Sequence, residues 1–233
     1  MSKSFFLVIS MAVTLLVVSA EAQTTIFNVP SADTQGRGSW GIEADFITKP
    51  VSYRDGGFQT YGYRVAYGLG NRTEVGSNFY LTKGLGDATG QIEFSVKQNI
   101  YRNEKLGVSV SGGAVIFVPV RPTNGDKTAI LVYANAKKEI EPLNGLTLTG
   151  GVYHVRRGNN FGTKTGVIAA AVQPITRKFS FVADWYSGKN RLGYASAGFN
   201  YNFTTRQYLL TGYSFGNSGR GNNAFAAYYG YTF

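Results

Sequence analysis

Residues 224–233 read AFAAYYGYTF, and two kinds of side chain alternate along them. Successive side chains of a β-strand point to opposite faces, so every second residue of this stretch shares a face. The first face comprises Phe225, Ala227, Tyr229, Tyr231 and Phe233. The second comprises Ala224, Ala226, Tyr228, Gly230 and Thr232. A strand of about ten residues with one aromatic face and one small or polar face is typical of a membrane barrel, with the aromatic face toward lipid.

Segments of similar length and alternation fill the chain upstream, separated by clusters of Gly, Asn, Asp, Lys and Arg. The twelve predicted strands are 39–48, 58–69, 72–82, 90–101, 105–118, 128–139, 145–156, 164–173, 178–187, 191–203, 206–216 and 222–233. Single-chain bacterial barrels have an even strand count, so we predict an all-β, antiparallel transmembrane barrel of 12 strands over residues 39–233, with 10 or 14 strands as alternatives.

The N-terminus predicts export. Lys3 precedes an apolar run over residues 5–18, and Ser19, Ala20 and Ala22 form a small-residue cleavage pattern, so residues 1–22 are predicted to be a signal peptide. Residues 23–38 are expected to form a periplasmic N-terminal segment, either an irregular tail or a stretch that faces the lumen. The tight predicted connections then face the periplasm together with both termini.

Composition excludes several kinds of site. The 233 residues include no cysteine, which rules out disulfides, thiolate metal sites and a thiol nucleophile. Charged residues are only 15% of the chain and aromatic residues another 15%, an unusual composition for a water-soluble domain. We expect no cofactor and no metal.

The last residues carry a resemblance to a known class. Tyr229, Tyr231 and Phe233 resemble the C-terminal strand of Gram-negative outer-membrane β-barrels. In that class the terminal aromatic residue is recognised by the barrel-assembly machinery. The resemblance implies a location in the cell outer membrane and an assembly signal at these three positions. It covers one strand of twelve and does not say what crosses the barrel.

Charged side chains on the inward faces are the candidate lumen site. They are Glu43, Asp45, Arg64, Glu74, Glu93, Lys97, Lys137, Glu139 and Asp184. Antiparallel pairing predicts Glu74 near Lys97, and Arg64 next to the strand of Glu43 and Asp45. Two hypotheses stay open: a structural charge network that rigidifies the wall, and a constriction that selects solutes. A twelve-stranded barrel is intermediate in width, so it holds either a narrow pore or a filled lumen.

A basic rim is predicted at the outer loops. Its residues are Arg121, Lys127, Arg156, Arg157, Lys164, Lys189 and Arg191. The net charge of +10 indicates an anionic neighbour. For an exported barrel this is first the lipopolysaccharide of the outer membrane, so the rim is expected either to bind lipid phosphates or to capture anionic solutes, and nucleic acid is not expected as a partner.

Enzymatic activity is not expected. The chain has one histidine, His154, which is followed by Val155 and Arg156. The outer-membrane phospholipase family has a serine two residues after its catalytic histidine, and that serine is absent here. The omptin-type proteases need an Asp-His pair, and none is predicted around His154. The sequence therefore favours a narrow porin-like channel for small hydrophilic solutes. The alternative is a non-conducting structural or surface-interaction barrel that binds lipopolysaccharide or another anionic partner.

Overall fold

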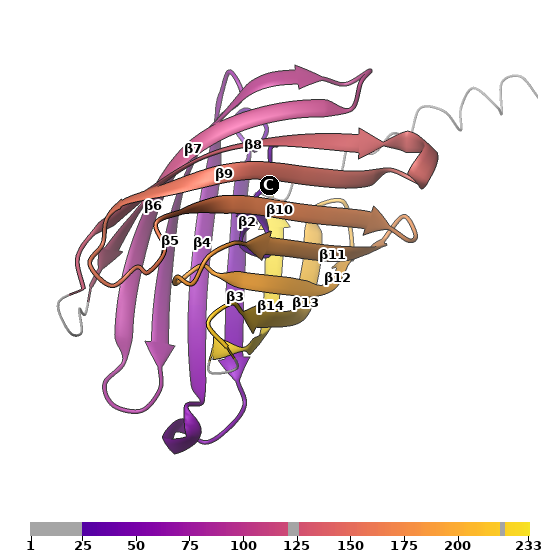
Figure 1. Cartoon of the computed structure of the whole chain (residues 1–233). Helices are drawn as coiled ribbons and strands as arrows, with labels where there is room; N and C mark the ends of the chain where they lie inside the picture. The colour runs from indigo at the N-terminus through magenta and orange to yellow at the C-terminus, as the bar shows by residue number, and fades with distance from the viewer. Residues whose placement is uncertain (1–24, 121–125, 220–221) are drawn as a thin grey trace, which may run out of the picture.

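The structure is a computed structural model that describes residues 25–120, 126–219 and 222–233. Twelve strands, β3 to β14, close into one antiparallel barrel (Figure 1). They are β3 (Trp40–Lys49), β4 (Phe58–Gly70), β5 (Thr73–Lys83), β6 (Thr89–Asn103), β7 (Val108–Pro119), β8 (Ala129–Ile140), β9 (Leu146–Arg157), β10 (Thr165–Pro174), β11 (Phe179–Tyr186), β12 (Tyr194–Asn202), β13 (Gln207–Gly216) and β14 (Ala224–Thr232). The predicted fold class is confirmed, and the strand ends lie within three residues of the predicted ones. The predicted signal peptide lies outside the described residues.

Each strand pairs with its neighbours in the chain, and β14 pairs with β3 to complete the ring. Trp40 N donates to Phe233 O at 2.8 Å, and Phe233 N donates to Trp40 O at 2.9 Å. This seam belongs to the short-turn end of the barrel, where tight connections such as 71–72 and 203–206 join the strands. The opposite, long-loop end carries the connections 50–57, 84–88, 120–128, 158–164, 187–193 and 217–223. In the part of the chain that the structure describes, no helix is long and apolar enough to cross a bilayer.

The two faces of each strand differ sharply in exposure. In β14, Phe225 is 52% exposed and Tyr229 is 45% exposed, whereas Tyr228 between them is 1% exposed. The same alternation runs around the barrel, so large apolar side chains such as Phe94 and Val152 cover its outer surface. A water-soluble monomer rarely exposes an apolar surface of this extent.

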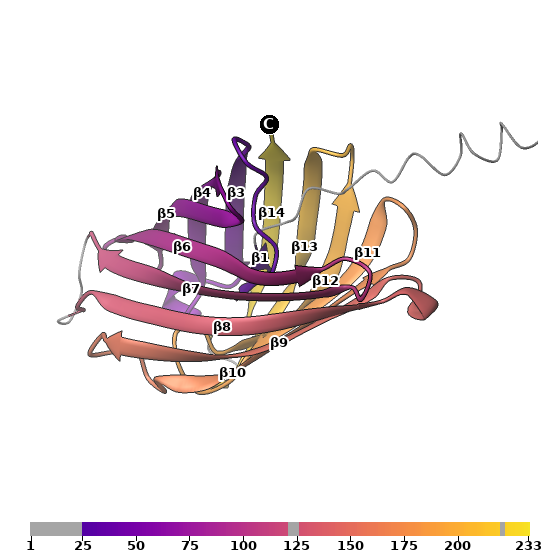
Figure 2. The same cartoon turned by 90° about the horizontal axis from the view of Figure 1, so that it is seen from above.

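The N-terminal segment, residues 25–38, is partly inside the barrel. Two short strands, β1 (Thr25–Ile26) and β2 (Val29–Pro30), form a hairpin in the lumen, and Figure 2 shows β1 within the ring of barrel strands. Phe27 and Val29 have no exposed surface. Of the two expectations for this segment, the structure shows the lumen-facing one for residues 25–35.

Glycines on the wall make room for this hairpin. Gly198 and Gly212 face each other on β12 and β13, and a Cβ atom on either would lie within 3 Å of the tip of the Phe27 ring. The Phe27 ring also contacts Tyr228 edge-on, with ring centroids 6.1 Å apart. The hairpin therefore packs closely against the wall inside the barrel.

The lumen has two chemically different halves. Inward side chains of β7–β13 form an apolar core with the hairpin, in which Leu131, Val155, Ile168, Val182 and Leu210 are each 2% exposed or less. The inward faces of β3–β6 instead carry most of the charged residues: Glu43, Asp45, Arg64, Glu74, Glu93 and Lys97. Asn99 Nδ2 on β6 and Asn135 Nδ2 on β8 donate hydrogen bonds to Ala32 O and Pro30 O of the N-terminal segment.

Candidate functional site

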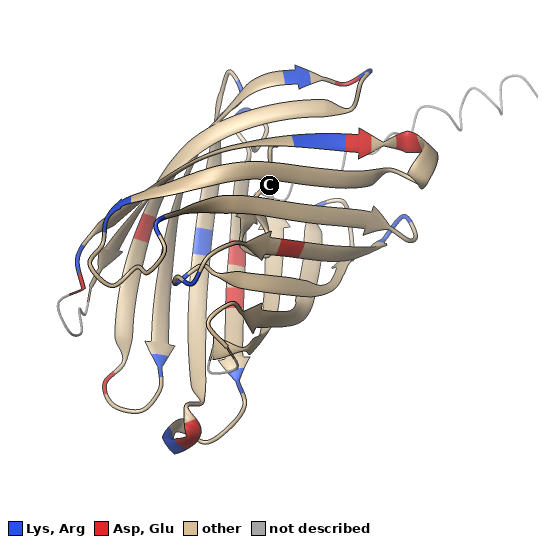
Figure 3. Ribbon diagram, viewed as in Figure 1, with Lys and Arg blue, Asp and Glu red and all other residues tan. Residues whose placement is uncertain are grey.

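The polar wall is the set of inward side chains on β3, β4, β5 and β6. The strand register places four of them in one row across the wall, because Glu43 pairs with Arg64, Arg64 with Asn78, and Asn78 with Glu93. In Figure 3 charged bands occur in the middle of β3 and β4, well away from the loops. This row is the centre of the site.

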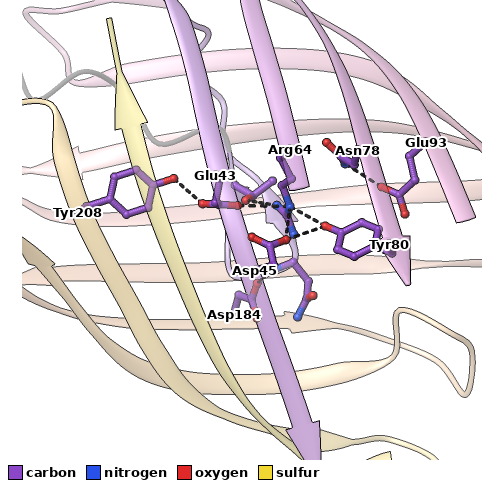
Figure 4. Close-up of polar contacts among 10 residues, drawn as sticks. Glu43, Asp45, Arg64, Asn78, Tyr80, Glu93, Asp184 and Tyr208 are labelled. Atoms are coloured by element: carbon purple, nitrogen blue, oxygen red, sulfur yellow. Dashed lines mark hydrogen bonds and ion pairs between the residues drawn. The ribbon is translucent and has the colours of Figure 1, made fainter. Parts of the chain in front are cut away.

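Arg64 lies between two carboxylates. Its Nε atom is 3.3 Å from Glu43 Oε1 and donates to Asp45 Oδ2 at 2.8 Å, as the close-up in Figure 4 shows. The same Nε also donates to Tyr80 Oη at 2.6 Å, and Nη1 donates to Thr25 Oγ1 of the N-terminal segment at 2.8 Å. A buried cation needs nearby opposite charge and hydrogen-bond acceptors, and these contacts supply both to Nε and an acceptor to Nη1.

Two tyrosines reach the carboxylates by lying across glycines. Tyr80 Oη donates to Asp45 Oδ2 at 2.9 Å, and Tyr208 Oη donates to Glu43 Oε2. Gly62 separates Asp45 from Tyr80 in the register, and Gly230 separates Glu43 from Tyr208. Any Cβ atom at these glycines would lie 2.4 Å or less from the tyrosine ring. The tyrosines therefore lie flat on the wall and leave space in the lumen.

Two further groups extend the polar wall. Toward the short-turn end, Lys97 Nζ is 3.3 Å from Glu74 Oε1, and Glu74 Oε2 accepts a hydrogen bond of 2.8 Å from Gln35 N. Toward the long-loop end, Gln91 Nε2 donates at 2.6 Å to Glu93 of the central row, which also accepts from Asn78 Nδ2 at 2.8 Å. The structure thus brings together both pairs that strand pairing predicted, Arg64 with Glu43 and Asp45, and Lys97 with Glu74.

The other predicted lumen residues bind the N-terminal segment, with one exception. Asp184 accepts hydrogen bonds from Asn28 N at 2.7 Å and Val29 N at 2.8 Å, and Lys137 forms an ion pair with Asp33. The prediction for Glu139 needs correction: it is exposed near the short-turn end of β8 and joins no ion pair among the described residues. It lies one residue before the strand ends, where an inward position no longer lies inside the lumen.

A cavity of about 530 Å³ lies along the polar wall. Its lining includes every inward residue of β5 from Glu74 to Thr82, which corresponds to about 26 Å along the strand. The N-terminal segment narrows it at the short-turn end through Gln35 and on one side through Thr25 and Pro30. At the long-loop end Phe161, Arg191 and Leu192, which we call the loop roof, complete the lining.

The predicted basic rim lies at the long-loop end. Its described members are exposed: Lys127, Arg156, Arg157, Lys164, Lys189 and Arg191. Arg121 lies outside the described residues. Arg191 differs from the others because its Nη2 atom donates to Gln91 Oε1 on the opposite wall, across the mouth of the cavity. The loop that carries it is tied to its neighbour by a bridge between Gly162 and Asn190.

His154 and the C-terminal aromatic residues lie on the outside of the barrel. His154 is exposed on β9, and its Nδ1 atom is 2.7 Å from Thr165 Oγ1 on β10. Tyr229 and Phe233 are 45% and 55% exposed, and Tyr231 lies between them on the same face. Within the described ranges, no group of three or more His, Asp or Glu side chains could hold a metal ion.

Sequence patterns did not predict the course of the N-terminal segment or the apolar half of the lumen. The tyrosine-over-glycine contacts were also missed, although the 30 glycines and 16 tyrosines of the chain were a signal for them. Each inward tyrosine of this kind faces a glycine directly across the strand pair, as Tyr133 does Gly113 and Tyr153 does Gly166. A cross-strand search for such pairs, made after the strand register was assigned, would have found them.

Comparisons with solved structures identify other barrels. The KdgM porin in complex with disordered oligogalacturonate matches with a TM-score of 0.57 and 10% identity, over 84% of this chain and 99% of that one. Outer membrane phospholipase A from Escherichia coli matches with a TM-score of 0.50 and 10% identity, over 90% of this chain and 96% of that one. An outer membrane channel from Pseudomonas putida F1 has a TM-score of 0.48 and 15% identity, over 87% and 98%. The first two likenesses show the barrel fold. No protein-family model and no curated protein matches the chain.

Proposed function

We propose that the protein is a narrow channel of the outer membrane for small solutes. The observation that carries the proposal is the cavity along the polar wall, which follows the inward face of β5 from one end of the strand to the other. The apolar outer surface supports a bilayer location, because the exposed side chains of β14 and its neighbours form the band that lipid would cover.

The geometry gives this pathway two narrow levels. The first is the row at Arg64, where Glu43, Tyr80 and Thr25 surround the guanidinium. The second is the contact between Gln35 and Glu74, beside Lys97, near the short-turn end. A solute that passes both levels gives up hydrogen bonds to water and forms hydrogen bonds to fixed protein groups. A narrow pore discriminates among solutes in this way.

A non-conducting barrel is the second candidate function, and the N-terminal segment favours it. Residues 26–32 fill the apolar half of the lumen, and the loop roof lies over the mouth. In that case the exposed cations at the long-loop end would bind lipopolysaccharide phosphates and the barrel would act as a surface anchor.

The same proposal includes how the protein is exported and assembled. Residues 1–22 act as a signal peptide for export, and Tyr229, Tyr231 and Phe233 act as the signal for the barrel-assembly machinery. Their outward direction on the last strand supports this role, since the assembly partner must read the strand from outside the lumen.

Single-channel recording of the refolded protein in a lipid bilayer tests the two functions. Ser95 lines the cavity on β6, and Val96 beside it points outward with 45% of its surface exposed. If the cavity conducts, Ser95→Trp lowers the conductance at least about twofold and the matched Val96→Trp leaves it unchanged. Absence of current in the wild-type protein would overturn the channel and leave the anchor.

A further inference from the structure

The cavity has two walls of different chemistry, and together they indicate what kind of molecule fits it. The polar wall presents Arg64, Asn78, Gln91 and Glu93. The remaining lining is largely apolar and includes Phe117, Leu131, Phe161 and Leu192. The two walls meet between β6 and β7, because Glu93 and Phe117 are direct partners in the register. A bound molecule would therefore touch hydrogen-bonding groups on one side and rings on the other.

The aromatic part of this lining is preorganised. Phe117 and Phe161 contact each other with ring centroids 6.0 Å apart, and both are at least 95% buried. Phe161 comes from the loop between β9 and β10, whose position is fixed by the hydrogen bond of 3.2 Å from Arg191 N to Phe161 O. The two rings back the apolar lining, and its partly buried members Val115 and Leu192 leave surface for a ligand to contact.

The charges around the cavity favour a neutral or positively charged molecule. Four carboxylates and three cations line it: Glu43, Glu74, Glu93 and Asp126 against Arg64, Lys97 and Arg191. Arg64 and Lys97 are held by Glu43, Asp45 and Glu74. Glu93 receives hydrogen bonds from two neutral amides and has no ion pair within 4 Å among the described residues. Glu93 therefore lines the cavity as a carboxylate with no cation in direct contact.

We infer that this cavity is a binding site for a small amphipathic solute, neutral or cationic, with hydroxyl or amino groups toward the polar wall and an aromatic or aliphatic body toward Phe117 and Phe161. A volume of about 530 Å³ is within the usual range of small-molecule sites, which have the same mixture of apolar lining and few polar groups. The inference deepens the proposed function, since it names the solute class of that pathway and rests on it for passage across the barrel.

Four glycosides that share one sugar frame test the solute class. Phenyl β-glucoside is neutral and amphipathic, phenyl β-glucosaminide is its cationic analogue, and phenyl β-glucuronide is its anionic analogue. Methyl β-glucoside lacks the ring. Binding is measured by isothermal titration calorimetry on the refolded, full barrel in detergent. We expect the first two probes to bind at least about tenfold more tightly than the glucuronide and the methyl glucoside, because the last two lose charge complementarity or ring burial.

Three variants locate the binding. Ser95→Trp fills the cavity and should abolish binding of phenyl glucoside, whereas Val96→Trp on the outer surface should keep it, and this pair also subtracts uptake into the detergent. Glu93→Gln removes the free carboxylate. It should weaken binding of the glucosaminide about tenfold and strengthen that of the glucuronide, so the ratio of the two affinities falls well below its wild-type value.

Equal or tighter binding of the glucuronide in the wild-type protein would overturn the inference, as would equal binding of the methyl and phenyl glucosides, no binding of any probe, or binding that survives Ser95→Trp. These outcomes are separate from the channel test, because equilibrium binding in detergent needs no current. A barrel that binds phenyl glucoside and passes no ions would keep this site and lose the channel, and a barrel that conducts without binding would do the reverse.

Discussion

Gly62 and Gly230 make room for tyrosine rings from neighbouring strands, a role that the sequence of one strand alone does not reveal. Each lies between an inward carboxylate and the tyrosine that caps it, so the ring passes directly over the glycine Cα atom. A side chain there would push the ring into the lumen and break the hydrogen bond to the carboxylate. Burial of a carboxylate whose donor has been removed costs on the order of 1–3 kcal/mol.

Replacement of Gly62 is therefore expected to destabilise the barrel. The added Cβ of Gly62→Ala would lie 2.4 Å from the Tyr80 ring and 2.9 Å from Asp45 Cβ, so we expect the free energy of unfolding to fall by about 2 kcal/mol. Gly150→Ala is the matched control, because nothing lies within 4 Å of its Cβ position. Guanidinium unfolding of both variants in detergent measures the difference, and equal stabilities would mean that Tyr80 does not lie over Gly62.

Substitution of Lys97 gives a second test at the level of a single residue. Its side chain and that of Glu74 are 4% and 7% exposed, so Lys97→Ala leaves a buried carboxylate without its partner. We expect a loss of about 3 kcal/mol in the free energy of unfolding, against less than about 0.5 kcal/mol for Lys83→Ala at the exposed end of β5. The thermal or guanidinium unfolding transition measures the effect. If both substitutions shift it by the same small amount, Lys97 does not point inward.

Strands were the elements that the sequence predicted best. Alternation with period two determines which residues of a strand share a face, and a shift of one residue would turn Phe225 and Tyr229 into the lumen. The ion pairs followed from that alternation together with antiparallel register. The N-terminal segment has no such periodicity. Within residues 25–35, Val29 N donates to Asp184 Oδ2 and Pro30 O accepts from Asn135 Nδ2, and these contacts depend on the closed barrel.

Removal of the N-terminal segment should widen the lumen. We expect deletion of residues 25–34 to raise the single-channel conductance at least about twofold, because the hairpin and its neighbours no longer occupy the interior. A change on the outer surface is the control: Val152→Ala, at a position that is 57% exposed, should keep the wild-type conductance. An unchanged conductance after the deletion would show that the segment does not narrow the pathway.

The C-terminal strand carries a prediction about assembly. Deletion of Phe233 removes an outward aromatic residue and both hydrogen bonds that join the strand to Trp40, so the amount of folded barrel in the outer membrane should fall several-fold. Phe225→Ala, an outward change on the same strand, is the control and should have a much smaller effect. The compact, heat-modifiable form on a gel reports folding, and an undiminished amount of it would remove the proposed assembly role.

The whole molecule has opposite charges at its mouth and in its interior. Exposed cations surround the long-loop end, while carboxylates outnumber cations around the cavity. The mouth attracts anions from solution and the interior disfavours them, so the proposed channel should show only a weak ion preference.

Reversal of the rim charges should move that preference toward cations. Lys127, Arg156 and Arg157 are exposed, so their change to Glu alters the field at the mouth without a loss of buried contacts. The same three positions changed to Gln serve as the control and should give about half the shift, because each substitution changes half as much charge. Reversal potentials across a salt gradient give the measurement, and no shift in either variant would mean that the rim does not face the pathway.

The pairing of β14 with β3 also has a consequence for the order in which the barrel folds. A ring that joins Trp40 to Phe233 encloses a loop of about 190 residues, and closing a loop of that length costs about 5 kcal/mol of chain entropy. We therefore expect the seam to be among the last parts of the wall to form. Residues 25–35 contact strands on opposite sides of the lumen, which means that the open sheet must curl around them before it closes. The hairpin is thus positioned as an internal support around which the barrel closes.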